Sequence, residues 1–251
     1  MKKRSLCCLF AGFCSAVALA NPAFDTGANY APPPWTTGSN QGFGFQPWSL
    51  QPSSGDASLN GFFIGDSNNN GGGGGPGIGS KAFGIYANSG QNAVADRPFN
   101  APLAIGEKFS ILMDNGFIDN GGDVITVLSD GFAVSQFYFL GGDSNYTFFD
   151  GASHTTSLGF TDGGLRLEWE RLSGSSYQFT ATRLVDNASW STVTTTTAAY
   201  NQVVMGNNNA GSFSQCDAFW NDLQIVPEPN SLTLLAFGAS WLLIRRRACK
   251  S

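Results

Sequence analysis

Glu168 and Glu170 are the residues best suited to acid–base chemistry. They lie two positions apart in 165–171, where apolar and charged residues alternate, so both side chains share one face of a predicted strand, with Cα atoms about 7 Å apart. Paired carboxylates are the catalytic groups of glycoside hydrolases. Trp169 points to the opposite face, and the neighbouring arginines favour an ordinary solvated strand face. We therefore expect a protein that is not an enzyme, and keep a glycoside hydrolase or lyase using Glu168 and Glu170 as an alternative.

Oxygen ligands gather in two loops. Asp66–Gly71 (DSNNNG) fits the start of a calcium loop, but the twelfth position, which needs a bidentate Glu, is Gly77. The second cluster comprises 114–116 and 119–123. Asn and Asp are also ordinary turn residues, so a Ca²⁺ site in these loops is an alternative and no cofactor is expected. With one histidine in the chain, a zinc site is not expected.

Exposed aromatic side chains could stack on sugar rings, and four tryptophans are candidate glycan-binding residues: Trp35, Trp48, Trp190 and Trp220. The alternative for each is burial in the core, which we expect for Trp169.

The middle of the chain is typical of an antiparallel β protein. Short apolar blocks are separated by Gly, Asn, Asp and Ser, and no segment shows a long 3.6-residue period. The predicted strands are 61–64, 81–87, 107–113, 123–128, 132–140, 146–149, 164–171, 177–185, 190–197 and 217–226. The strands 164–171 and 177–185 should form a hairpin. We expect 29–52 to cross the sandwich irregularly with Trp35 and Trp48 tucked in, and the Asn/Gly-rich run 66–79 to be a mobile surface loop that packs no core.

The N-terminus has the pattern of a secretory signal peptide. A cationic start (Lys2, Lys3, Arg4) precedes an apolar stretch that ends in Ala18-Leu19-Ala20. We predict a signal peptide over 1–20, with signal peptidase cutting before Asn21.

The C-terminus combines three features. Val226-Pro227-Glu228-Pro229 ends the last strand, 231–244 is uncharged and apolar, and Arg245, Arg246 and Arg247 follow. The apolar segment predicts one transmembrane helix, and the arginines would stay cytoplasmic. This order resembles the PEP-CTERM sorting signal of Gram-negative bacteria, over 227–251. The resemblance implies recognition by exosortase, a membrane-embedded protease-transpeptidase, and delivery from the membrane to the cell surface or exopolysaccharide matrix.

Processing leaves an acidic ectodomain over 21–226. The segment from Asn21 to Glu228 holds 6 basic and all 18 acidic residues, a formal charge near −12, which excludes nucleic acid as a partner. Of five cysteines only Cys216 remains, so no intramolecular disulfide forms. A catalytic thiol is not expected, because His154 is its only imidazole partner and nothing in the sequence brings the two together.

The strand pattern predicts an all-β antiparallel sandwich or jelly roll. The hairpin 165–185 and the closing strand 217–225 resemble concanavalin A-like (laminin G-like) sandwiches. The leading hypothesis is an exported surface or matrix protein that binds polysaccharide without catalysis. The alternatives are a purely structural matrix protein and the hydrolase named above.

Overall fold

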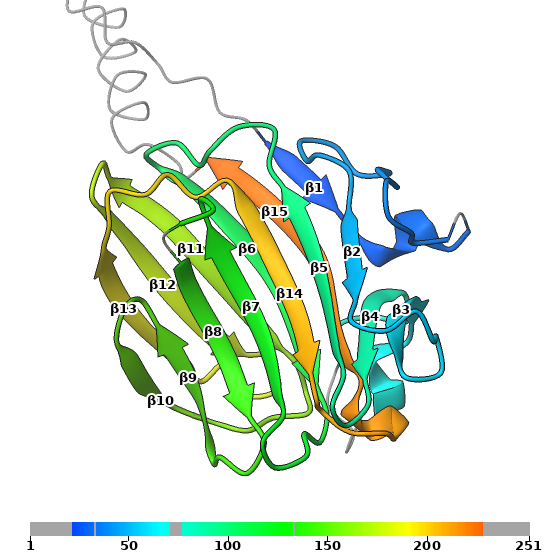
Figure 1. The fold of residues 1–251 in the computed structure, drawn as a ribbon. Helices are drawn as coiled ribbons and strands as arrows, with labels where there is room; N and C mark the ends of the chain where they lie inside the picture. The colour runs from blue at the N-terminus through cyan, green and yellow to red at the C-terminus, as the bar shows by residue number, and fades with distance from the viewer. Residues whose placement is uncertain (1–21, 33, 71–76, 133, 228–251) are drawn as a thin grey trace, which may run out of the picture.

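Two antiparallel sheets stack face to face in the computed structural model, which describes residues 22–32, 34–70, 77–132 and 134–227 (Figure 1). The predicted all-β antiparallel sandwich is confirmed. The eight-stranded sheet has the order β13 (Ser189–Thr195), β12 (Ser176–Arg183), β11 (Leu165–Ser173), β6 (Glu107–Asn115), β15 (Ala218–Pro227), β4 (Ala82–Ala87) and β3 (Asn60–Gly65), with β1 (Ala23–Asp25) paired to β15. The seven-stranded sheet has the order β10 (Ser153–Gly159), β9 (Asn145–Phe149), β8 (Val134–Leu140), β7 (Asp123–Ser129), β14 (Gln202–Asn208), β5 (Asn92–Pro98) and β2 (Ser49–Pro52).

All ten predicted strands are strands in the structure, with small shifts at their ends. Five further strands were not predicted: β1, β2, β5, β10 and β14. The helical segments within the described residues are three 3₁₀ turns, η1 (Gly27–Tyr30), η2 (Ser67–Asn70) and η3 (Ser214–Cys216).

The two-residue alternation of the central hairpin determines which side chains form the core. In β11 Leu165, Leu167 and Trp169 are fully buried, whereas Glu168 and Glu170 lie on the outer face. In β12 the ring of Phe179 stacks on Phe148 of the opposite sheet, with centroids 4.4 Å apart. The aromatic side chains of both sheets therefore meet in one shared core.

A buried ion pair joins the two sheets near the N-terminus. Arg97 of β5 donates to Asp25 of β1 over 2.9 Å, and both side chains are fully buried. The Tyr30 hydroxyl donates to the same carboxylate (2.8 Å) and accepts from Trp48 Nε1 (3.2 Å). This network holds the irregular segment before β2 against the core, as the sequence predicted for Trp48.

The segment around η2 differs from its sequence-based prediction. We expected 66–79 to be a mobile loop that packs no core, but Ser67, Asn70 and Ile78 are buried. Ile78 packs with Ala82 and Phe219 on the outer face of the eight-stranded sheet. The described ends of this loop therefore cover part of that face.

No helix within the described residues is long and apolar enough to cross a membrane. The predicted helix 231–244 lies outside the described residues, as does the predicted signal peptide 1–20.

Candidate functional site

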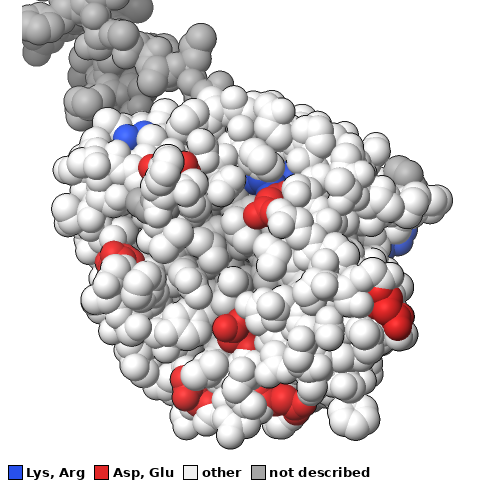
Figure 2. All heavy atoms as spheres, in the orientation of Figure 1, with Lys and Arg blue, Asp and Glu red and all other residues white. Residues whose placement is uncertain are grey.

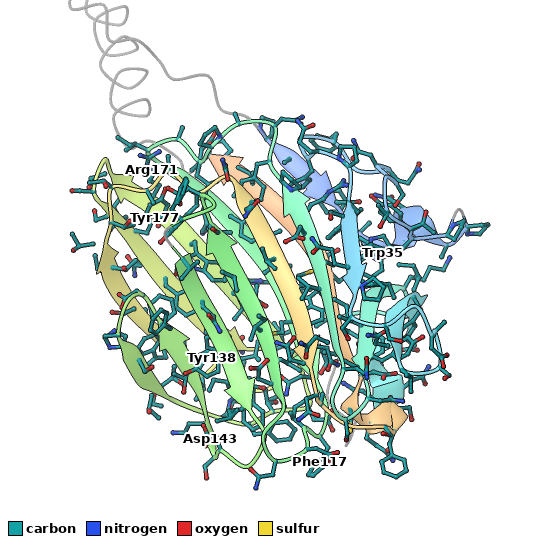
Figure 3. The ribbon with its side chains drawn as sticks, viewed as in Figure 1. Trp35, Phe117, Tyr138, Asp143, Arg171 and Tyr177 are labelled. Atoms are coloured by element: carbon teal, nitrogen blue, oxygen red, sulfur yellow. The ribbon has the colours of Figure 1, made fainter. Side chains whose placement is uncertain are left out.

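The outer face of the seven-stranded sheet carries an open hollow of about 430 Å³, here called the Tyr138 hollow. Its floor is formed by β7, β8, β9 and the start of β10. The side chains that line it are Asp123, Gln136, Tyr138, Leu140, Phe149 and Ser153. Figure 3 shows Tyr138 on β8, in the sheet nearer the viewer. The volume is within the range of small-ligand sites.

Strand alternation explains why these side chains point outward. In β8 Ser135, Phe137 and Phe139 are buried in the core, so the residues between them face solvent. Gln136 pairs with Phe149 of β9, and Phe149 pairs with Ser153 of β10. The pairing places an amide, an aromatic ring and a hydroxyl in one row across three strands.

Polar groups of the Tyr138 hollow are available to a ligand. The Tyr138 hydroxyl and the Gln136 amide form no hydrogen bond with any other side chain or backbone group of the described residues. Asp123 accepts a 2.5 Å hydrogen bond from Asn208 Nδ2, and burial raises its pKa above the ordinary value. The hollow therefore combines two aromatic rings with donors and acceptors, the lining that binding sugars requires.

Acidic groups dominate the charge of this face. Figure 2 shows Asp and Glu in separate patches across it, with few basic groups. Asp96 of β5 accepts a 2.5 Å hydrogen bond from Gln51, and burial raises its pKa. An anionic ligand would meet electrostatic repulsion here.

A smaller hollow of about 230 Å³ lies at the lower rim of the sandwich in Figure 3, where Phe117 and Asp143 are labelled. Phe117 is 62% exposed and Phe160 is 40% exposed. A third hollow, of about 270 Å³, shares Phe149 with the Tyr138 hollow and contains Asp150. Asp150 lies 2.9 Å from His154, which helps to lower the pKa of the Asp150 carboxyl against the opposing effect of burial.

The structure corrects the candidate glycan-binding tryptophans. Trp35, Trp48 and Trp220 are buried in the core, so their rings offer no face to a sugar. The indole of Trp220 also donates to Thr126 Oγ1 over 2.7 Å, which satisfies its polar atom inside the core. Trp190 is partly buried and packs against the same core. Trp169 is fully buried, as expected.

Glu168 and Glu170 share the outer face of β11, as predicted, on the sheet opposite the Tyr138 hollow. Lys108 Nζ of β6 lies 3.3 Å from Glu168 Oε1, and each side chain is about one quarter exposed. Neither glutamate lines any of the three hollows described above. These surroundings are those of a solvated strand face, and neither glutamate lies in a cleft described here.

The remaining predicted residues fall into two groups. Cys216 is buried and free, and burial raises the pKa of its thiol, while His154 pairs with Asp150. Val226 and Pro227 are the last residues of β15 and pair with Lys108 and Glu107. The other sorting and cleavage residues lie outside the described residues: Ala18, Ala20, Asn21, Glu228, Pro229, Arg245, Arg246 and Arg247.

Metal-ligating side chains are sparse in the described part of the chain. No three Asp, Glu, His or Cys side chains gather there in a group that could hold a metal. The two loops that the sequence suggested for Ca²⁺ do meet, however, because Ser67 and Asn70 lie beside Asp114.

Sequence reasoning missed the residues of the Tyr138 hollow. The segment 132–140 was predicted as a strand, and its pattern contains the signal: Phe137 and Phe139 alternate with Gln136 and Tyr138. An aromatic residue in the polar phase of a strand marks a ring that faces solvent.

No protein-family model matches the chain, and no curated protein matches it. Among solved structures, the apo Crh5 transglycosylase has a TM-score of 0.44 and 12% identity, covering 79% of this chain and 88% of its own. The globular domain of T. cruzi calreticulin has a TM-score of 0.45 and 10% identity, covering 75% of this chain and 87% of its own. A glycosyl hydrolase family protein from Mycobacterium fortuitum has a TM-score of 0.38 and 11% identity, covering 58% of this chain and 78% of its own. Similarities at this level assign the chain to no family and carry no functional argument.

Proposed function

We propose that this protein binds polysaccharide without catalysis, as an exported component of the cell surface or exopolysaccharide matrix. The observation that supports binding is the Tyr138 hollow. The rings of Tyr138 and Phe149 and the free polar groups of Gln136 and Tyr138 lie together on the outer face of the sheet, outside the core. Such a lining can stack on sugar rings and hydrogen-bond their hydroxyls.

The charge of the protein narrows the ligand class to neutral glycans. The segment 21–228 has a formal charge near −12, and Asp123 lies in the hollow itself. A uronate or sulfate polymer would be repelled, whereas a neutral chain can use a carboxylate as a hydrogen-bond acceptor.

The acidic pair on β11 gives little support to a hydrolase. Glu168 is close to the Lys108 ammonium, and both glutamates lie on the sheet opposite the hollow. A catalytic pair needs a substrate cleft between the two carboxyl groups. We therefore propose a binding protein rather than an enzyme.

Localisation rests on the two termini. The charged, apolar and small-residue order of 1–20 supports export, and Pro227-Glu228-Pro229 with the arginine cluster supports processing by exosortase. The proposed route leads through a membrane-anchored stage to the surface of a Gram-negative bacterium. We also propose that the sandwich is related to concanavalin A-like domains, as the hairpin 165–185 and the closing strand suggest.

The test is a binding assay with the full-length chain in mild detergent against a panel of neutral and acidic polysaccharides. We expect saturable binding to a neutral glycan and a loss on the order of tenfold for Tyr138→Ala. Phe213→Ala is the control, because this ring is 72% exposed and lies outside the three hollows.

Two outcomes would overturn the proposal. Binding unchanged in Tyr138→Ala would place the ligand elsewhere. Absence of saturable binding across the panel would instead support a purely structural matrix protein.

A further inference from the structure

The outward row of side chains on β8 continues beyond the Tyr138 hollow into the third hollow, of about 270 Å³, here called the Phe132 hollow. Val134, at the start of β8, lines the Phe132 hollow, and Gln136, the next outward residue, lines the Tyr138 hollow. Phe149 of β9 lines both. The two hollows are therefore neighbours on one side of the sandwich, with the Phe149 side chain at their junction.

Together the two hollows are longer than a single sugar ring. The outward row runs from Val134 to Leu140, and each residue extends a strand by about 3.3 Å, so the row measures about 20 Å. The Tyr138 hollow takes up the part of the row around the labelled Tyr138 in Figure 3, and the Phe132 hollow takes up the start of β8. A ligand that fills both must be a chain of several units.

Phe132 presents its ring to solvent from a turn with a defined backbone. Its side chain is 97% exposed. The Phe132 amide donates to Asp130 Oδ1 over 3.0 Å, and the Gly131 amide donates to Ser129 Oγ over 2.8 Å. These two bonds hold the turn between β7 and β8. A phenyl ring kept wholly in water is unfavourable, and a ligand that covers it removes that cost.

Hydroxyl groups and one carboxylate make up much of the remaining lining of the Phe132 hollow. Three consecutive threonines at the end of β13, 194–196, contribute the hydroxyls. The carboxylate is that of Asp150, whose Oδ1 lies 2.9 Å from His154 Nε2. With Asp123 in the Tyr138 hollow, an anionic polymer would pass a carboxylate in each hollow. A neutral chain rich in hydroxyl groups avoids that repulsion and can use the same groups as hydrogen-bond partners.

We propose that the Phe132 hollow and the Tyr138 hollow are two parts of one site, which binds a linear stretch of neutral polysaccharide lying along β8. Phe132 and Tyr138 offer a ring to the sugar in each hollow, and Phe149 lies between them. The inference rests on the proposed function and adds to it the length and the direction of the bound chain.

A site of two parts makes affinity depend on the length of the ligand. A short oligosaccharide fills one hollow only. Once one end of a longer chain is bound, the other end meets the second hollow at a high effective concentration, so the whole chain binds more tightly than either end alone.

The test measures binding of the full-length chain in mild detergent by isothermal titration calorimetry. The probes are three neutral, largely linear polysaccharides (pullulan, laminarin and glucomannan) and size-fractionated oligosaccharides prepared from each. We expect Kd to fall at least tenfold between the disaccharide and oligosaccharides long enough to span both hollows.

Two variants separate the two hollows. Phe132→Ala and Tyr138→Ala should each weaken binding of the long oligosaccharides about three- to tenfold, since each removes one stacking ring. A short oligosaccharide should lose affinity in only one of the two variants, because it occupies only one hollow. Phe213→Ala is the control, since this ring is 72% exposed outside the three hollows and its loss should change neither ligand's Kd.

Hydroxyl-radical footprinting read by mass spectrometry gives a second measurement that needs no variant. A long oligosaccharide should protect both Phe132 and Tyr138 from oxidation, and a short one should protect one of them.

The outcomes distinguish this inference from the proposed function. Long oligosaccharides that lose affinity in Tyr138→Ala and keep it in Phe132→Ala would refute the inference and leave polysaccharide binding at the Tyr138 hollow intact. A Kd that does not depend on length would refute it as well. Absence of saturable binding to all three polysaccharides would count against the proposed function, and the inference would fall with it.

Discussion

Replacing Trp48 separates a core role from a sugar-binding role most sharply. Its indole is 1% exposed, and its ring centroid lies 5.1 Å from the rings of both Trp35 and Phe83. Truncating a buried Trp to alanine costs about 3–5 kcal/mol in the free energy of unfolding. The Arg97 guanidinium is 4.9 Å from the same ring, and a desolvated cation–π contact adds about 2 kcal/mol. Truncating the ring already removes the cation–π contact, so the two costs overlap. We therefore expect Trp48→Ala to lower the free energy of unfolding by about 5 kcal/mol.

The matching assay is urea unfolding followed by circular dichroism. With a slope of about 2–3 kcal/mol/M, a loss of 5 kcal/mol lowers the midpoint by about 2 M. Trp48→Phe keeps most of the packing but removes the indole donor to Tyr30, so it should lose about 1–2 kcal/mol. The folded fraction of either variant should bind polysaccharide as the wild type does. A midpoint shift below 0.5 M for Trp48→Ala together with lost binding would refute the reasoning.

Three further results are expected. The double variant Glu168→Gln/Glu170→Gln should bind polysaccharide as the wild type does, and neither protein should release reducing sugar above background. Hydrolysis by the wild type that the double variant lacks would contradict a role in binding alone. Burial raises the pKa of Asp217 from 3.8 to about 7. The protonated carboxyl therefore contributes stability below about pH 4, and this contribution, at most about 4 kcal/mol, is lost as the pH rises through 7. Asp217→Asn should flatten the profile of Tm against pH between about pH 5 and 8, and an unchanged profile would show that Asp217 ionises freely. Asp25→Asn and Arg97→Met should each cost about 3–5 kcal/mol because each leaves a buried partner, whereas the double variant should cost less than their sum; additive losses in urea unfolding would argue against coupling of the pair.

Strands with a regular apolar phase were predictable from the sequence, whereas β5, which has a charged residue in its inward phase, was not. Leu165, Leu167 and Trp169 gave an unbroken alternation, so β11 and its outward glutamates followed directly. In β5 the inward position is Arg97, and its partner Asp25 lies 72 residues away. No local pattern can show that such a charge will be satisfied inside the core.

The Asn/Gly-rich segment shows a related limit. Composition predicted a loop without core contacts, yet Ser67 and Asn70 are buried because a carboxylate from β6 lies beneath them. Short polar side chains pack well when a distant segment supplies their partners. Composition reports the average tendency of a segment and carries no information on such partners.

Exposure of aromatic residues could be inferred within strands but not outside them. Tyr138 lies in a strand whose phase is set by two buried phenylalanines, so its outward direction follows from geometry. Trp35 and Trp48 lie in an irregular segment, where no period relates neighbouring side chains. Trp48 packs against Arg97 and Phe83, and Trp35 packs against Phe62 and Phe83, all from strands elsewhere in the chain.

The two outer faces of the sandwich differ in what covers them. On the eight-stranded sheet, Ile78 packs against Ala82 and Phe219, so the described ends of the 66–79 loop remove apolar surface from solvent. On the seven-stranded sheet, Tyr138 and Phe149 line an open hollow of about 430 Å³. Apolar surface that a protein leaves open is costly unless a ligand uses it, which favours the seven-stranded face for binding and leaves the covered face a structural role.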